Sequence, residues 1–124
     1  LLLEPLNTRI DHPGMFLNDT RLALDIIEAV DSPRLQLLFD VYHSMVMEEE
    51  MEEVLGGRMH RVGHVQIAQA PDRNEPDPRS GEWPALIARL QRLGYNGAIG
   101  LEYKPSLPAA ASVARAREAT GLSC

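Results

Sequence analysis

Three carboxylates and one carboxamide stand at comparable places in four apolar stretches of this sequence. They are Glu4, Asp40, Gln66 and Glu102, which are separated by 36, 26 and 36 residues. An ionised carboxylate in an apolar stretch needs a hydrogen bond, a charged partner or a metal ion to offset its desolvation. Oxygen donors of these kinds suit Mg²⁺ or Mn²⁺ better than zinc, which prefers sulfur and imidazole. We therefore expect one divalent-cation site made of the four side chains; the alternative is that each one caps a helix or pairs with an arginine.

The elements that would position these side chains alternate between strand and helix. Short apolar runs predict strands at Leu1–Leu6, Leu35–Val41, Val62–Ala68 and Ala98–Tyr103. Such runs are typical of strands that are buried on both faces of a parallel sheet. In that arrangement, the polar side chain of each run lies at or near the carboxyl end of its strand.

Helical periodicity fills the intervals between the predicted strands. A helix over 19–30 is indicated by Leu22, Ile26 and Val30 at four-residue spacing, with Asn18 or Asp19 as its N-cap. Further helices are predicted along a stripe of Met47, Met51, Val54 and Leu55, from Trp83 to Gly94, and over 108–119. The glutamates at positions 48–50 and 52–53 are interpreted as the solvated side of the second helix.

Alternation of this kind predicts an α/β fold with parallel strands and right-handed crossovers. Either a doubly wound sheet or half of a (β/α)8 barrel would satisfy it. The glycine-rich phosphate loop of dinucleotide-binding sheets is missing after the first strand, which favours the half barrel. A full barrel needs about 250 residues, so we expect residues 1–124 to form a single partial domain. Because the chain starts without methionine inside a strand-like run, we expect a fragment or a trimmed chain.

The composition of the chain indicates which classes of partner and which cellular compartment to expect. The formal net charge of −6 disfavours binding to nucleic acid. No apolar run approaches the roughly 20 residues that cross a bilayer, and no signal peptide is evident, so no membrane association is expected. The only cysteine is Cys124, which excludes an intrachain disulfide and is taken as an inert residue in a reducing compartment. We therefore expect a cytoplasmic protein.

Several stretches of the chain closely resemble the C-terminal half of the hydroxypyruvate isomerase family. This family lies in the xylose-isomerase-like barrel superfamily, together with 2-oxo-tetronate isomerases and ketose 3-epimerases. The stretches are "LLLEPLNTR", "LFDVYH", "GHVQIAQAPDRNEPD" and "GYNGAIGLEYKP". They occur in the order of the family and span nearly the whole chain, so the resemblance implies four strands and about four helices of a TIM barrel.

The resemblance also implies a role for each of the four oxygen-bearing residues. Glu4 and Glu102 match the paired catalytic glutamates, which in this family also bind the divalent metal. Asp40 and Gln66 match the two remaining metal ligands. Gln66 further separates the subfamilies, because ketose 3-epimerases carry a histidine at that position.

Three more residues are expected to bind substrate. His43 and Arg73 match substrate-contacting positions of the relatives. His64 lies two residues before Gln66 and so faces the same side of its strand, where it would orient a ligand or the substrate.

The implied reaction interconverts hydroxypyruvate and tartronate semialdehyde. One glutamate would remove a proton, the other would return it, and Mg²⁺ or Mn²⁺ would neutralise the oxyanion that develops. The alternatives are a 2-oxo-tetronate isomerase or ketose 3-epimerase acting on a longer hydroxy-oxo acid or sugar-like substrate, an endonuclease of the same superfamily, and an inactive half-barrel fragment. Because a half barrel leaves sheet edges and an apolar face uncovered, we expect it to form a homo-oligomer or to pair with the missing N-terminal half.

Overall fold

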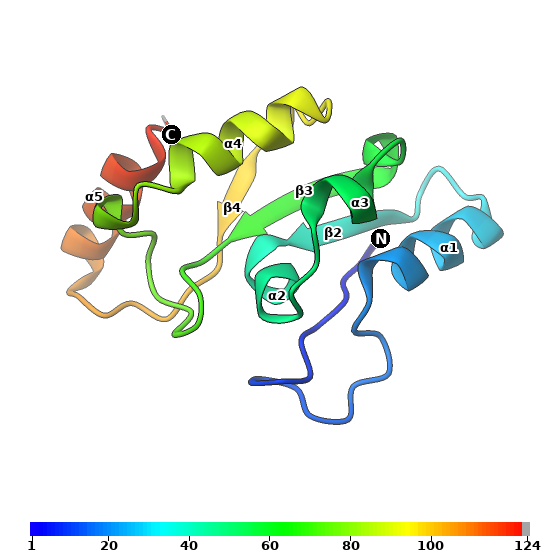
Figure 1. The fold of residues 1–124 in the computed structure, drawn as a ribbon, viewed down its shortest axis with the longest axis horizontal. Helices are drawn as coiled ribbons and strands as arrows, with labels where there is room; N and C mark the ends of the chain where they lie inside the picture. The colour runs from blue at the N-terminus through cyan, green and yellow to red at the C-terminus, as the bar shows by residue number, and fades with distance from the viewer. Residues whose placement is uncertain (123–124) are drawn as a thin grey trace.

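Four parallel strands form one sheet in the order β1-β2-β3-β4 (Figure 1). They are β1 (Leu2–Leu3), β2 (Gln36–Asp40), β3 (Val62–Ile67) and β4 (Ile99–Leu101). The structure is a computed structural model that describes residues 1–122, so Cys124 lies outside the described residues. The predicted parallel α/β fold is confirmed, although the first strand is much shorter than its apolar run.

Five helices connect or follow the strands. They are α1 (Thr20–Val30), α2 (Val41–Val46), α3 (Met51–Leu55), α4 (Trp83–Arg92) and α5 (Ala109–Thr120), with 3-10 turns at Met59–Arg61 and Pro78–Ser80. Among residues 1–122, no helix is long and apolar enough to cross a bilayer.

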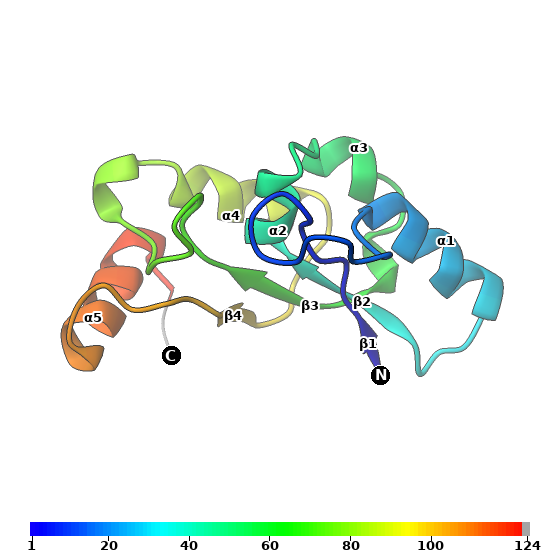
Figure 2. The same ribbon diagram turned by 90° about the horizontal axis from the view of Figure 1, so that it is seen from below.

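The helices α1, α3 and α4 lie on one side of the sheet (Figure 2). Strand residues that face them are buried, such as Phe39 of β2 and Val65 of β3, and they pack against Leu24, Trp83 and Leu90. Neighbouring residues on the opposite face are only half-buried, including Leu38, His64 and Gln66. Burial on both faces was therefore a wrong expectation for this chain by itself, and the uncovered face is the one that carries polar groups.

The first helix matches its predicted range, but its buried side differs from the predicted stripe. Asp19 caps the helix by accepting a hydrogen bond from the backbone N–H of Leu22 at 2.8 Å. Its buried apolar residues are Ala23, Leu24 and Ile27, whereas Leu22 and Val30 are exposed. The buried stripe thus combines a three-residue and a four-residue step and lies one residue further along the chain than the predicted stripe of Leu22, Ile26 and Val30.

The single helix predicted along the methionine stripe is wrong, because the chain forms two short helices separated by a turn. Asp40 ends β2 and accepts a hydrogen bond from the backbone N–H of Tyr42 at 2.9 Å, so α2 begins directly after the strand. Glu48 then adopts a left-handed conformation with φ of 62°, which reverses the chain before α3.

The acidic run in this turn is not purely a solvated face. The carboxylate of Glu49 accepts hydrogen bonds from the backbone N–H of Thr20 at 2.8 Å and from its hydroxyl at 2.7 Å. Glu49 thereby satisfies an N–H at the start of α1 and places a negative charge near the positive end of that helix. Glu53, by contrast, forms an exposed ion pair with Arg21.

Loss of the Glu49 contact and loss of the Glu53 contact should lower the free energy of unfolding by different amounts. Replacing Glu49 with Ala should lower the free energy of unfolding by about 1 kcal/mol, the usual cost of losing an N-terminal capping side chain. The control Glu53→Ala removes only an exposed ion pair and should cost less than about 0.5 kcal/mol. Urea unfolding monitored by circular dichroism would measure both, and equal losses would contradict the capping role of Glu49.

Both outer strands of the sheet have one unpaired edge. Leu1 and Leu101 expose 90% and 42% of their surfaces. A groove of about 570 Å³ runs beside β4 between α4 and α5, lined in part by Leu90 and Ile99. Unpaired strand edges next to apolar surface favour pairing with another chain.

We therefore predict that the 124-residue chain, expressed alone, self-associates in solution. Strand pairing and apolar burial are both available at its open edges. Sedimentation velocity at several concentrations would measure the oligomeric state, and addition of the N-terminal half of a relative should compete with self-association. A concentration-independent monomer would contradict the prediction.

Candidate active site

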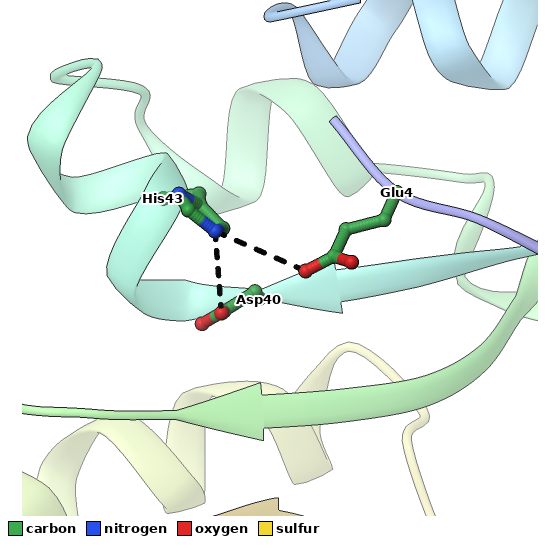
Figure 3. A group of neighbouring side chains, drawn as sticks. All are labelled: Glu4, Asp40 and His43. Carbon is green, nitrogen blue, oxygen red and sulfur yellow. Dashed lines mark ion pairs between the residues drawn. The ribbon is translucent and has the colours of Figure 1, made fainter. Parts of the chain in front are cut away.

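The carboxyl end of the sheet brings Glu4, Asp40 and His43 together. Glu4 follows β1, Asp40 is the last residue of β2, and His43 lies on α2. Each offers one ligand atom, and these three atoms lie within 4.8 Å of one another. Figure 3 shows the three side chains converging, with His43 Nε2 placed 3.9 Å from Glu4 Oε1 and 3.7 Å from Asp40 Oδ2.

Local structure explains why Asp40 and His43 meet. The side chain of Asp40 caps α2, so the helix starts with Val41 and His43 falls within its first turn. Residues three apart on a helix share a face, which brings the imidazole over the carboxylate. The strand register places Asp40 directly opposite Gln66 of β3.

Arg73 connects two of the predicted ligand positions. Its Nη2 lies 3.4 Å from Asp40 Oδ2 and 2.7 Å from Glu102 Oε2. The guanidinium also lies over the ring of Tyr42, at 4.9 Å from the centroid. Arg73 has a φ of 56°, and its carbonyl oxygen accepts a 2.7 Å hydrogen bond from the N–H of Lys104. The loop after β3 thus holds the positively charged guanidinium of Arg73 beside the carboxylates of Asp40 and Glu102.

Gln66 and His64 both lie on the uncovered face of β3, as their spacing predicted. The register places Gln66 opposite Gly100 of β4. A Cβ atom on Gly100 would lie 2.7 Å from His64 Nε2 and 3.3 Å from Gln66 Cγ. Glycine at this position therefore makes room for both side chains.

Burial and nearby negative charges raise the pKa values of the two carboxyl groups near His43. Burial, followed by repulsion from Asp40 and Glu102, raises the pKa of Glu4 to about 7. Burial also raises the pKa of Asp40 to about 6, although the Tyr42 N–H and Arg73 oppose this shift. Both carboxyl groups can therefore exchange protons close to neutral pH.

The pKa of His43 is shifted downward, in the opposite direction to the pKa values of Glu4 and Asp40. Burial, reinforced by the positive charge of Arg73, lowers the pKa of His43 to about 4. The imidazole is therefore neutral near pH 7, and its approaches to Glu4 and Asp40 are not ion pairs at that pH.

Three buried polar atoms at this end of the sheet have no hydrogen-bond partner within the described residues. They are Glu4 Oε1, His43 Nε2 and Gln66 Oε1. Unsatisfied buried polar atoms are costly, and two of these three, Glu4 Oε1 and His43 Nε2, lie 3.9 Å apart, which indicates a place where a ligand supplies the missing interactions. The carboxylates of Glu4 and Asp40 and the amide oxygen of Gln66 are donor types that a hard divalent cation prefers, whereas Glu102 is paired with Arg73.

Sequence reasoning missed the residues that support the site from behind. Asp11 accepts hydrogen bonds from the Tyr42 hydroxyl at 2.6 Å and from Asn7 Nδ2 at 2.7 Å. These bonds outweigh the effect of burial and keep the pKa of Asp11 below its ordinary value. Burial and the bond to Asp11 raise the pKa of Tyr42 to about 12. The sequence feature that could have indicated them is the polar stretch "NTRID" at residues 7–11, three residues after Glu4.

Comparison with known proteins shows which family this chain matches. Residues 1–120 match the model of the xylose isomerase-like TIM barrel family. The chain is 38% identical to hydroxypyruvate isomerase from Escherichia coli and 40% identical to 2-oxo-tetronate isomerase from Cupriavidus necator. Each alignment covers 85% of this chain and 40% of the relative.

A solved structure of an AP endonuclease of family 2 from Brucella melitensis superposes with a TM-score of 0.81 at 34% identity. The superposition covers 91% of this chain and 43% of that protein. The chain thus spans about 40% of the length of the relatives it matches. With its four parallel strands and polar strand ends, it belongs to the xylose isomerase-like TIM barrel family.

Proposed function

We propose that the protein containing this chain is an isomerase that interconverts hydroxypyruvate and tartronate semialdehyde. The observation that carries the proposal is the group of Glu4, Asp40 and His43 at the carboxyl end of the sheet, which Arg73 links to Glu102. Sites of (β/α)8 enzymes lie at this end of the strands. Relatives that match 84 to 85% of the chain and are named as hydroxypyruvate isomerases support the substrate.

Glu4, Asp40, Gln66 and Glu102 would hold a divalent cation, which we propose to be Mg²⁺ or Mn²⁺. The buried oxygens Glu4 Oε1 and Gln66 Oε1, which accept no hydrogen bond from the part of the chain that the structure describes, support this assignment. When bound, the cation would act as a Lewis acid that neutralises negative charge on the substrate oxygens.

The two glutamates would carry out the proton transfer. One carboxylate removes a proton from C3 of hydroxypyruvate, and the electron pair of that C–H bond forms the C2–C3 double bond of an enediolate. Protonation at C2 by the other glutamate and transfer of the O3 proton to O2 then give tartronate semialdehyde. The pKa of Glu4, raised to about 7, suits proton transfer near neutral pH, because a general base works best when its pKa lies near the operating pH.

Arg73 and the two histidines would bind the substrate. The guanidinium of Arg73 can hold a carboxylate through two parallel hydrogen bonds. It already pairs with Glu102 and lies over Tyr42, so its position is restricted before substrate binds. His43 would contact a reacting oxygen, and His64 would lie on the substrate side of β3.

The nearest alternative substrate is a 2-oxo-tetronate, since a relative with that name is 40% identical over 85% of the chain. A ketose 3-epimerase would use the same catalytic groups on a longer polyol. The family resemblance speaks against it, because ketose 3-epimerases carry a histidine at the position of Gln66. An endonuclease is disfavoured by the net charge of −6. Turnover of hydroxypyruvate, a 2-oxo-tetronate and a ketohexose by the intact protein would rank these functions, and nicking of abasic DNA would favour the endonuclease.

Loss of either glutamate should abolish most of the isomerase activity. In the intact protein, Glu4→Gln or Glu102→Gln should lower kcat by at least about 100-fold, the low end of a general acid or base contribution. Glu118→Gln, an exposed change on α5, is the matched control and should leave kcat unchanged. Near-normal turnover in a Glu4 or Glu102 variant would remove that residue from the proton transfer.

Metal binding should tighten as pH rises from 5.5 to 8. The pKa values of Glu4 and Asp40 lie at about 7 and about 6, so the cation competes with protons in this range and displaces them. Calorimetric titration of the metal-free protein with Mn²⁺, in buffers of different ionisation enthalpy, would measure affinity and proton release together. Gln66→Ala is the control, because it should weaken binding without changing the number of protons released; a pH-independent affinity would contradict the assignment.

A further inference from the structure

The side chain of Asn7 is fully buried between the turn after Glu4 and the imidazole of His43. Its Oδ1 accepts hydrogen bonds from the backbone N–H of Ile10 at 3.1 Å and of Asp11 at 3.0 Å. Because an amide oxygen accepts and an amide nitrogen only donates, these two donors fix which way the carboxamide points. Nδ2 must therefore face the opposite side.

On that side, Nδ2 of Asn7 has two acceptors, one for each of its hydrogens. It lies 2.7 Å from Asp11 Oδ2 and 2.7 Å from His43 Nδ1. The backbone N–H of Asn7 also donates to His43 Nδ1, at 3.1 Å. A single residue thus directs two donors at one ring nitrogen of His43.

These two donors determine the protonation of the imidazole. A hydrogen on His43 Nδ1 would point at both Asn7 donors, so Nδ1 must present its lone pair. This excludes the imidazolium form and the Nδ1–H tautomer. The remaining form carries its hydrogen on Nε2, which faces Glu4 and Asp40 and has no hydrogen-bond partner among residues 1–122.

We propose that Asn7 is a positioning residue that holds His43 as the Nε2–H tautomer. Although Glu4, Asp40 and His43 have the spacing of a metal-binding group, an Nε2 that carries a hydrogen has no lone pair for a cation. His43 therefore stays outside the ligand set and donates a hydrogen bond to a substrate oxygen. The identity of that acceptor rests on the proposed isomerase function, whereas the tautomer is a property of this chain and requires no substrate.

The tautomer can be measured directly in the intact, unmodified protein. Nuclear magnetic resonance of ¹⁵N-histidine-labelled protein distinguishes a protonated from an unprotonated ring nitrogen, and comparison with His43→Gln assigns the signals among the four histidines. We expect Nε2 of His43 to carry the hydrogen both in EDTA and after addition of Mg²⁺. A hydrogen on Nδ1, or loss of the Nε2 hydrogen when Mg²⁺ is added, would overturn the proposal.

Asn7→Asp tests the positioning role. The aspartate keeps an oxygen for the N–H groups of Ile10 and Asp11 but replaces the Nδ2 donor with an acceptor, which favours a hydrogen on His43 Nδ1. We expect signals of the Nδ1–H form to appear and kcat to fall about 100-fold, as for loss of one donor to a developing oxyanion. An unchanged tautomer in the folded variant would show that Asn7 does not control it.

The control Asn18→Asp introduces the same charge into the same loop, where the side chain of Asn18 contacts Thr8 Oγ1 at 3.1 Å instead of His43. It should change neither the tautomer nor kcat, and an equal effect of both variants would assign the result to charge alone. If Asn7→Asp does not fold, the spectrum of the unmodified protein still decides the tautomer. If the protein does not isomerise hydroxypyruvate, that spectrum is unaffected, so the two proposals fail separately.

Discussion

The carboxylate of Asp40 is the group on which most of the site depends. One oxygen accepts the backbone N–H of Tyr42 and starts α2, while the other faces His43 and Arg73. Without the cap, the first turn of α2 would lose the bond that directs Tyr42 toward Asp11 and His43 toward Glu4. A single buried side chain therefore connects the end of a strand, the start of a helix and the charged end of the sheet.

This arrangement places opposing demands on the folded chain. Burial favours the protonated forms of Glu4 and Asp40, whereas the proposed chemistry needs their ionised forms. A folded-state pKa above the unfolded value means that the metal-free chain loses stability as pH rises through that interval. A bound cation reverses this effect, because it favours ionised carboxylates. Stability and function are thus coupled at the same two residues.

Much of the fold followed from patterns along the chain. Apolar runs located all four strands. Because parallel strands share one carboxyl edge, the polar ends of these runs predicted a common site for Glu4, Asp40, Gln66 and Glu102. The break between α2 and α3 was not predictable from periodicity. At this break Glu49 binds Thr20, which is 29 residues away in sequence, and no local pattern encodes such a contact.

The supporting residues of the site were hidden for the same reason. Asn7 contacts His43 across 36 residues and Tyr42 contacts Asp11 across 31. Each of these side chains is ordinary in its local context, so its role becomes visible only when the chain is folded. The resemblance to a known family implies which groups react, which stays a prediction, but it gives no information on what orients them.

The close packing of Gly100 against His64 links two neighbouring strands through a steric constraint. Any side chain at position 100 would occupy space that the imidazole now fills, so the imidazole would have to move or be replaced by a smaller group. Conversely, a smaller residue at position 64 would leave an unfilled hollow beside the glycine. The two positions are therefore sterically coupled, so that a larger residue at position 100 of β4 requires a smaller one at position 64 of β3.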